Sequence, residues 1–302
     1  MSDPATQSLS VTAAAKLNLW LRVLGRRDDG YHCLDSLVGF VEWHDTLTLH
    51  PAAAVELTVS GPEAAGLAAG DATGDNLVLR AARDLRALCG VTAGVRIHLD
   101  KHIPVAAGLG GGSADAAAVL RGLCRLWRIS PPAPALDAVA LALGADVPVC
   151  LRARPARVGG TGGSVVTGPD LPGAWVVLVN PRLPVATAAV FAAYQPAAAT
   201  PGGAVTREPL APAGTVAELA AQCRRIGNDL TAAAIAVAPA IGTVLSVLAE
   251  DRHALISAMT GSGGTCFALY ESAAAAEAAA AAIHAAHAGW WVVVSRLATP
   301  AG

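Results

Sequence analysis

The residues from Pro104 to Ser113 form the segment best suited to chemistry, reading Pro-Val-Ala-Ala-Gly-Leu-Gly-Gly-Gly-Ser. Its glycines, Gly108 and those at 110–112, allow positive φ angles and a close approach of the backbone to a ligand. The alanine-rich residues that follow predict a helix, whose first N–H groups have no partner within the helix. A phosphate group fits such a helix start well. The segment therefore predicts an anion-binding loop.

Two familiar phosphate motifs do not match this loop. A Walker A loop requires a Lys after its last glycine, but Ser113 follows Gly112. A dinucleotide fingerprint requires a third glycine where Ser113 stands, and it normally follows an opening strand near the start of a domain. A plain strand-to-helix turn stays open as the alternative.

Charged and amide side chains elsewhere could act on a bound phosphate. Lys16 and Asn18 are two apart in a predicted strand and so share a face. Asp146 lies between two apolar segments, and next to a lysine its carboxylate could orient or accept the proton of a hydroxyl. The ammonium would then neutralise charge on a transferring phosphoryl group. An exposed strand face for Lys16 and Asn18, and a helix cap for Asp146, stay open.

Two further groups of residues extend this pattern. Tyr31 and His32 follow a turn at Gly30, which is a suitable place to stack on and hydrogen-bond a planar base, although a structural histidine is the alternative. Thr260-Gly-Ser-Gly-Gly-Thr265 is a second glycine-rich turn, which could simply link two strands. Two glycine loops with a lysine and an aspartate favour phosphoryl transfer more than any one of them alone.

Both helical and strand periods occur in the first half of the chain. Residues 95–100 alternate and predict a strand with Val95, Ile97 and Leu99 inward, and Ser113 is expected to cap a helix reaching about Leu123. Further strands are expected at 9–13, 17–24, 46–50 and 55–60, with a helix at 76–89. The mixture indicates an α/β or α+β layered fold. An Arg-, Gly- and Pro-rich stretch at 152–174 marks the expected boundary, giving domains 1–165 and 166–302.

The second half predicts helices that cover a small antiparallel sheet. Helices are expected at 215–225, 228–236 and 239–249, followed by strands at 254–259 and 265–270 and a final helix and strand. A strand is also expected at 175–179 and a loop at 195–204.

Composition excludes several classes of protein. The chain has 302 residues, a formal net charge of −2 and 54% hydrophobic but only 4% aromatic residues, which is typical of a globular protein. No basic face for nucleic acid is expected, and the apolar region 273–294 is interrupted by charged and polar residues, so no membrane span is expected. The first ten residues lack an export signal, which favours the cytoplasm. Six scattered cysteines indicate neither a disulfide framework nor a metal site, and no metal ligand is assigned.

Together, these motifs resemble the GHMP small-molecule kinases, and the resemblance runs nearly end to end. It rests on motifs that occur in the family's order and spacing, namely those around Lys16, Arg27–His32, Asp75–Leu77, Lys101–Pro104, Gly108–Ser113 with Asp115, Gly144–Pro148, Asn228–Leu230 and Gly261–Gly263. Asp-Gly-Tyr-His is the most specific of them. The sequence departs from the family's usual pattern at Gly264 and at 157–163.

The resemblance implies an α+β, two-domain GHMP kinase fold, with an N-terminal ribosomal-S5-domain-2-like domain and a C-terminal ferredoxin-like domain. It also implies ATP-dependent phosphorylation of the C2 hydroxyl of a diphosphocytidyl methylerythritol, in the non-mevalonate route to isoprenoid precursors. ATP is then the co-substrate, and Mg²⁺ is expected with it. The chain is expected to act as a monomer or weak homodimer.

By position, the resemblance also assigns residues. Asp146 would be the catalytic base and Lys16 its charged partner, with Asn18 beside them. The ATP-binding residues would be Asn76, Lys101, Pro104, Val105, Ala106, Ala107, Gly108, Leu109, Gly110, Gly111, Gly112 and Ser113. The substrate-binding residues would be Asn18, Tyr31, His32, Thr187 and Phe191. A GHMP kinase for another metabolite and a catalytically silent nucleotide-binding regulator are the alternatives.

Overall fold

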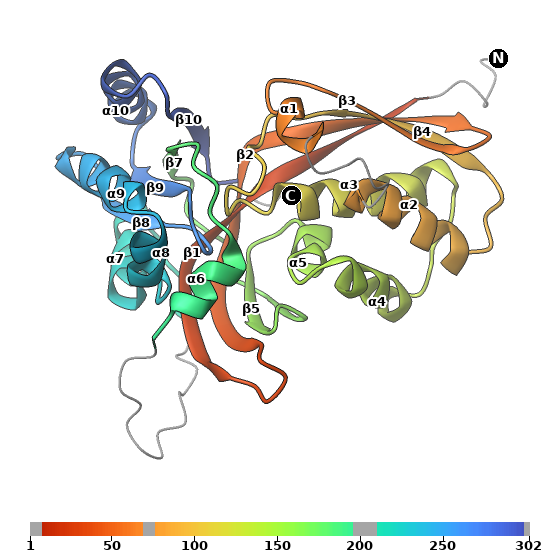
Figure 1. Cartoon of the computed structure of the whole chain (residues 1–302), viewed down its shortest axis with the longest axis horizontal. Helices are drawn as coiled ribbons and strands as arrows, with labels where there is room; N and C mark the ends of the chain where they lie inside the picture. The colour runs from red at the N-terminus through yellow and green to blue at the C-terminus, as the bar shows by residue number, and fades with distance from the viewer. Residues whose placement is uncertain (1–7, 69–75, 196–209, 299–302) are drawn as a thin grey trace. The chain divides into compact units, whose positions relative to one another are not determined.

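The computed structural model describes residues 8–68, 76–195 and 210–298. The chain divides into two compact units (Figure 1). Unit 1 comprises Met1–Ala15, Trp43–Val105 and Gly110–Ala153, and unit 2 comprises Lys16–Glu42, Ala106–Leu109 and Arg154–Gly302. The expected loop at 195–204 lies outside the described residues except for residue 195. Asp75 also lies outside them.

These units differ from the expected division at residue 165. Strands β1 (Leu9–Arg26) and β2 (His32–Ala52) have 18 and 21 residues, so each is about 60 Å or more in length and contributes to both units. Local periodicity does not reveal that one strand serves two units. The division into domains 1–165 and 166–302 stays a prediction about domain organisation.

Unit 1 packs helices against one face of a sheet (Figure 1). Strand β4 (Gly94–Asp100) pairs in parallel with β3 (Val55–Ser60) and antiparallel with the second half of β2. The helices are α1 (Ala64–Ala68), α2 (Leu77–Leu88), α3 (Gly111–Leu126), α4 (Ala133–Leu143) and α5 (Val147–Arg152). Val95, Ile97 and Leu99 are buried, which confirms their expected inward face. An added Cβ at Gly122 of α3 would lie 2.5 Å from Leu49, so glycine permits this close helix–sheet contact.

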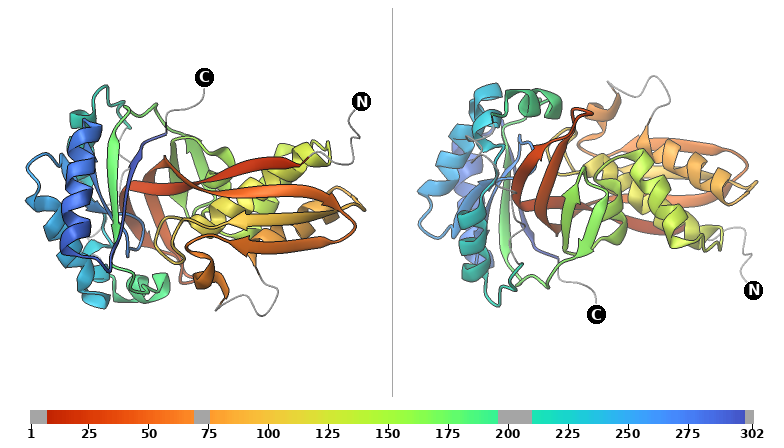
Figure 2. Two further views of the ribbon diagram at one scale, coloured as in Figure 1. Left: turned by 90° about the horizontal axis from the view of Figure 1, so that it is seen from above. Right: turned by 90° about the horizontal axis from the view of Figure 1, so that it is seen from below.

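Unit 2 contains a second sheet, covered on one face by a layer of helices (Figure 2). Among the described residues its strand order is β10-β7-β9-β8, and every pair is antiparallel, which confirms the expected small antiparallel sheet. The strands are β7 (Trp175–Asn180), β8 (Ile256–Met259), β9 (Cys266–Tyr270) and β10 (Trp291–Arg296). The helices are α6 (Thr187–Ala193), α7 (Val216–Ile226), α8 (Thr231–Val237), α9 (Ala240–Glu250) and α10 (Ala273–Ala286).

The Arg- and Gly-rich segment at 152–174 is not a simple linker. It contains a hairpin of β5 (Ala156–Gly160) and β6 (Ser164–Thr167), and β5 pairs antiparallel with the first half of β2. Val158 lies opposite Ser36 in this pairing. The hairpin therefore extends unit 2 where composition alone indicated a boundary.

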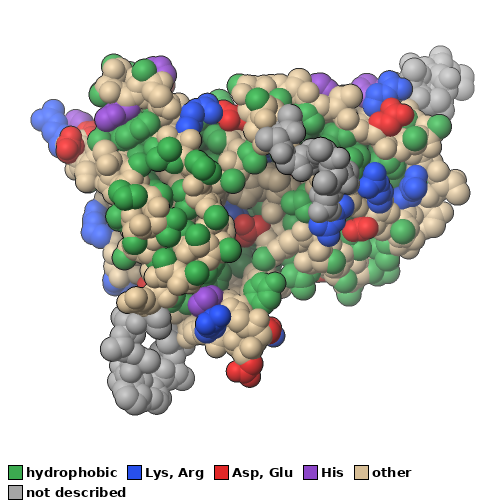
Figure 3. Space-filling model, in the orientation of Figure 1, with side chains coloured by type: hydrophobic (Ala, Val, Ile, Leu, Met, Phe, Trp, Pro, Cys, Tyr) green, Lys and Arg blue, Asp and Glu red, His purple; other side chains and the backbone are tan. Residues whose placement is uncertain are grey.

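Charged side chains are spread over the surface. On the face shown in Figure 3, Lys and Arg side chains occur singly or in small groups, with Asp and Glu side chains among them. This agrees with the small formal net charge of −2. Among the described residues, no helix is long and apolar enough to cross a membrane.

Candidate active site

The part of the glycine loop that belongs to unit 2 requires glycine at residue 108. Its φ is +76°, and an added Cβ would lie 2.3 Å from the carbonyl oxygen of Gly263. Ala106 also has a positive φ, of 54°. The backbone therefore turns sharply here, and it lies directly against the second glycine-rich turn.

The part of the loop that belongs to unit 1 leads directly into α3. Gly110 has a left-handed conformation with φ of 64° and occupies the N-cap position, so the helix begins at Gly111. The expectation that Ser113 caps this helix is therefore wrong, because Ser113 lies within the first turn. The first hydrogen bond runs from Ala114 N to Gly110 O, at 2.8 Å. Amides in a first turn have no carbonyl one turn earlier to bond, which suits an anion such as a phosphate group. Pro104 is buried and Val105 is exposed.

Lys16 and Asn18 do not form an exposed strand face. Their relative exposures are 4% and 5%, so this alternative is wrong. Lys16 Nζ donates a hydrogen bond of 2.8 Å to Asn18 Oδ1. The backbone N–H of Lys16 donates to the carbonyl oxygen of Leu109, at 2.9 Å. The strand that carries the ammonium is thus bonded directly to the glycine loop.

The second glycine-rich turn contacts the first loop and β1. Asn18 N donates to Thr260 Oγ1 at 2.8 Å. At the other end of the turn, both the backbone N–H and the hydroxyl of Thr265 donate to Ala107 O, at 3.2 and 2.7 Å. The turn therefore does more than link two strands, since it holds the loop and the Lys16–Asn18 pair together within unit 2.

Four of the predicted substrate-binding residues also lie in unit 2. The ring of His32 stacks on that of Phe191, with centroids 5.0 Å apart and planes inclined by 24°. Tyr194, which the sequence did not single out, meets His32 edge-on at 6.1 Å. Thr187 Oγ1 lies 2.9 Å from Ser262 Oγ in the second glycine turn. Tyr31 is 67% exposed, so its ring is available to a ligand.

The pKa of His32 is lowered from its usual value of 6.5. Burial is the larger cause, and the positive charge of Arg26 is the second. Both disfavour the imidazolium form. The neutral imidazole is therefore favoured, and it has one ring nitrogen as donor and the other as acceptor.

Lys101 lies in a buried cluster of charges in unit 1. Its ammonium donates to Asp115 Oδ2 at 2.7 Å and also to Asp45. Asp45 additionally accepts the backbone N–H groups of His102 and Ile103, at 2.5 and 2.8 Å. An added Cβ on Gly111 would lie 3.0 Å from Lys101 Nζ. The cluster therefore packs directly against the start of α3.

This cluster holds two acidic side chains and one basic side chain, and this imbalance favours the protonated form of one carboxyl group. Burial raises the pKa of Asp115 to about 7, with the charge of Asp45 adding to the effect and that of Lys101 opposing it. The two carboxylates raise the pKa of Lys101 against the opposing effect of burial. Among the described residues, Asp115 Oδ1 is buried without a hydrogen-bond partner.

Asn76 and Asp146 begin two helices of unit 1. Asn76 caps α2, where its Oδ1 accepts the N–H of Val78 at 2.8 Å. Asp146 occupies the corresponding position of α5, but its side chain makes no capping hydrogen bond. Asp146 therefore stands at the N-cap position, but it lacks the side-chain capping bond that the sequence left open as its role.

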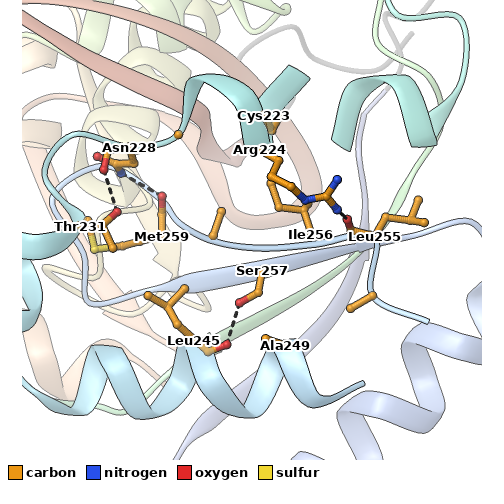
Figure 4. A pocket seen from close by; sticks show the side chains of 13 residues that line it. Cys223, Arg224, Asn228, Thr231, Leu245, Ala249, Leu255, Ile256, Ser257 and Met259 are labelled. Carbon is orange, nitrogen blue, oxygen red and sulfur yellow. Dashed lines mark hydrogen bonds between the residues drawn. The ribbon is translucent and has the colours of Figure 1, made fainter. Parts of the chain in front are cut away.

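A cavity of about 410 Å³ lies elsewhere in unit 2, beside α7, α9 and β8 (Figure 4). Asn228 lines it and donates from Nδ2 to Met259 O and Gly261 O, at 2.9 and 2.8 Å. Asn228, the first residue of the Asn-Asp-Leu motif, therefore holds the backbone of the second glycine turn through these two hydrogen bonds. Among the described residues, no group of three or more His, Cys, Asp or Glu side chains could hold a metal ion.

Comparisons with known proteins agree with these features. Residues 76–154 match the GHMP kinases N terminal domain, and residues 209–289 match the GHMP kinases C terminal domain. A 4-diphosphocytidyl-2-C-methyl-D-erythritol kinase of Paramagnetospirillum magneticum is 50% identical over 292 residues, covering 96% of this chain and 99% of the relative. The enzyme of that name from Parvibaculum lavamentivorans is 47% identical, covering 98% and 99%.

Solved structures show the same fold. The crystal structure of a 4-(cytidine 5'-diphospho)-2C-methyl-D-erythritol kinase has a TM-score of 0.75 and 32% identity, covering 96% of this chain and all of the other. A homoserine kinase from Cytophaga hutchinsonii has a TM-score of 0.71 at 20% identity, covering 96% and 95%, and shows the fold alone. The two-domain α+β GHMP kinase fold is therefore confirmed, and the chain belongs to the 4-diphosphocytidyl-2-C-methyl-D-erythritol kinase family of GHMP small-molecule kinases.

Proposed function

We propose that the chain transfers the γ-phosphoryl group of ATP to the C2 hydroxyl of 4-diphosphocytidyl-2-C-methyl-D-erythritol. The products are the 2-phosphate and ADP, in the non-mevalonate pathway to isoprenoid precursors. Two relatives named 4-diphosphocytidyl-2-C-methyl-D-erythritol kinase match nearly the whole chain, at 50% and 47% sequence identity. The observation that carries the proposal is the bonding of Lys16 to both Asn18 and the glycine loop, in the unit that also holds the His32–Phe191 stack.

ATP is the donor, and the glycine loop is its proposed phosphate site. The fit rests on the amides at the start of α3, which have no carbonyl partner one turn earlier. The residues proposed to bind ATP are those at 104–113 together with Asn76 and Lys101. For Lys101 the contribution is support of the loop, since its ammonium is buried against two carboxylates. Mg²⁺ is proposed to accompany ATP and to neutralise phosphate charge.

Lys16 and Asp146 are proposed to carry the chemistry. The Lys16 ammonium would stabilise negative charge on the transferring phosphoryl group. The Asp146 carboxylate would orient the acceptor hydroxyl and take its proton, which is the usual role of a carboxylate in such transfers. Asn18 holds the ammonium through its amide oxygen.

The cytosine end of the substrate is proposed to lie at the aromatic residues of unit 2. Tyr31 and Phe191 offer ring faces, and neutral His32 offers a hydrogen-bonding edge. Thr187 would add a polar contact next to Ser262. Cytoplasmic location and a monomeric or weakly dimeric state stay predictions.

ADP release tests the proposal. The purified chain is assayed with the cytidyl substrate, mevalonate and a sugar as acceptors, each with and without Mg²⁺. ADP should form with the cytidyl substrate and Mg²⁺, and at least about 10³-fold more slowly with the others, because they leave the polar groups of a base-binding site unpaired. Equal rates with mevalonate would indicate a different GHMP kinase, and no ADP with any acceptor would indicate a silent nucleotide-binding protein.

A further inference from the structure

Ser36 lies on β2, beside the Lys16–Asn18 pair, and no motif of the sequence draws attention to it. It is only 2% exposed. Its Oγ donates a hydrogen bond of 2.6 Å to the carbonyl oxygen of Trp20 and accepts one of 2.8 Å from Asn18 Nδ2. Both oxygen and nitrogen of the Asn18 amide are therefore engaged, the oxygen by Lys16 and the nitrogen by Ser36.

The chemistry of these groups fixes which way the amide faces. A carbonyl oxygen can only accept, so the single proton of the Ser36 hydroxyl points to Trp20. Towards Asn18 the serine oxygen can then only accept, and it must face the NH₂ group. The amide oxygen is thereby directed to Lys16. Without the hydroxyl, the amide NH₂ would lose the acceptor that Ser36 provides, and an amide flip would place the NH₂ group against the ammonium.

The backbone of Asn18 is held independently of its side chain. Its N–H donates to Thr260 Oγ1, and Thr260 is fully buried. Asn228 donates to the carbonyl oxygens of Met259 and Gly261, on either side of Thr260, and Figure 4 shows its side chain directed to Met259. The position of residue 18 is thus set by the second glycine turn. Ser36 has the narrower task of setting its amide orientation.

We propose that Ser36 is a positioning residue for phosphoryl transfer, acting through Asn18 on the ammonium of Lys16. A lysine side chain has several rotatable bonds, and a bond from one ammonium proton to a fixed acceptor limits where the other two point. Ser36 would thus direct the charge of Lys16 to the transferring group. The inference rests on the proposed function, since it assigns Ser36 to that reaction.

The test compares Ser36→Ala with Ser36→Thr, which retains a hydroxyl. In Ser36→Ala we expect kcat to fall about tenfold, the equivalent of one hydrogen bond of about 1.4 kcal/mol, while KM for both substrates stays within about twofold. Ser36→Thr should recover most of the lost kcat. An unchanged kcat in Ser36→Ala, with the wild-type chain active on the cytidyl substrate, would overturn the inference and leave the proposed function intact.

A double-mutant cycle distinguishes action through Asn18 from a general loss of structure. In an Asn18→Ala background, the Ser36→Ala change should no longer lower kcat, because the amide it orients is gone. Full additivity of the two effects would contradict the proposal. Ser257→Ala is a matched control, since Ser257 also donates to a backbone carbonyl, that of Leu245 at 2.9 Å, in the same unit but at the cavity wall (Figure 4). It should leave kcat unchanged.

A measurement without turnover keeps the inference testable if the wild-type chain is inactive. The side-chain NH₂ protons of Asn18 can be followed by ¹⁵N NMR in the full chain. They should exchange slowly with solvent in the wild type and in Ser36→Thr, and at least tenfold faster in Ser36→Ala. Equal exchange in all three would show that Ser36 does not orient the amide. Inactivity of the wild type towards the cytidyl substrate would overturn the proposed function, and with it the catalytic part of the inference.

Discussion

The ring of His32 lies on the ring of Phe191, with centroids 5.0 Å apart and an interplanar angle of 24°. A third ring cannot enter between two rings that already stack at this distance. The two side chains therefore form one wall, and a base would bind against it rather than inside it. Phe191 fixes the orientation of the His32 ring in this arrangement, and Tyr194 meets that ring edge-on.

We expect His32→Ala to weaken binding of the cytidyl substrate while changing kcat little. The imidazole would be lost as a hydrogen-bonding edge, and a specific bond to a base contributes to ground-state and transition-state binding alike. Steady-state kinetics should show KM for this substrate raised about tenfold or more and KM for ATP unchanged. An unchanged KM for the cytidyl substrate would remove His32 from its recognition.

The buried cluster of Lys101, Asp45 and Asp115 predicts a specific dependence of stability on pH. The folded chain holds the proton of Asp115 up to a pKa of about 7, whereas an unfolded chain releases it near 3.8. Stability should therefore decline as the pH rises from about 4 to about 7, by about 1.4 kcal/mol per pH unit or on the order of 4 kcal/mol in all, and Asp115→Asn should remove that decline. Denaturant unfolding at pH 5 and pH 8 measures it.

Lys101→Met provides the contrasting variant in that experiment. It leaves the buried Asp45 carboxylate without its cation, so the free energy of unfolding at pH 7 should fall by about 3 kcal/mol or more. A parallel pH profile for wild type and Asp115→Asn would show that Asp115 does not hold a proton in the folded chain.

Gly108→Ala should destabilise the loop and raise KM for ATP. The alanine would have to adopt a φ near +76° with its Cβ 2.3 Å from Gly263 O, so the backbone must move. Gly112→Ala serves as a control for folding only, because its Cβ would meet nothing nearer than Leu77 at 3.6 Å. Thermal unfolding should show a clear loss for Gly108→Ala and none for Gly112→Ala. Equal melting temperatures for wild type and Gly108→Ala would refute the tight contact.

Some elements follow from local sequence alone and others do not. Strand β3 occupies the predicted residues 55–60, and α2 and α9 lie within one residue of their predicted ends, since each has a clear period. The strand β2 from His32 to Ala52 was predicted only at 46–50. Its residues 35–41 are buried without alternation, so no period of two is visible there.

The residues of the candidate site also fall into two groups, those that the sequence reveals and those that it does not. The glycine loop, Lys16, Asn18 and Asp146 are visible in the sequence because their residue types suit phosphate chemistry. Their partners are not, since Ser36 is one hydroxyl in an apolar strand and Asp45 pairs with a lysine 56 residues later. Only the pairing of distant segments brings such residues together, and no local pattern encodes it.

Asp146→Asn should preserve folding and ATP binding but lower kcat by about 10²-fold or more. An amide of the same shape can orient a hydroxyl but cannot accept its proton. Circular dichroism and calorimetry with ATP serve as controls. Turnover close to that of the wild type would remove Asp146 from proton transfer.

The most direct test of the central claim is the product itself, followed by ³¹P NMR with ATP, Mg²⁺ and 4-diphosphocytidyl-2-C-methyl-D-erythritol. We predict one new phosphomonoester signal, coupled to the methylerythritol carbon C2, that grows in equal amount with ADP and disappears in Asp146→Asn. ADP without a phosphomonoester, or a phosphate attached at another oxygen of the substrate, would contradict the account.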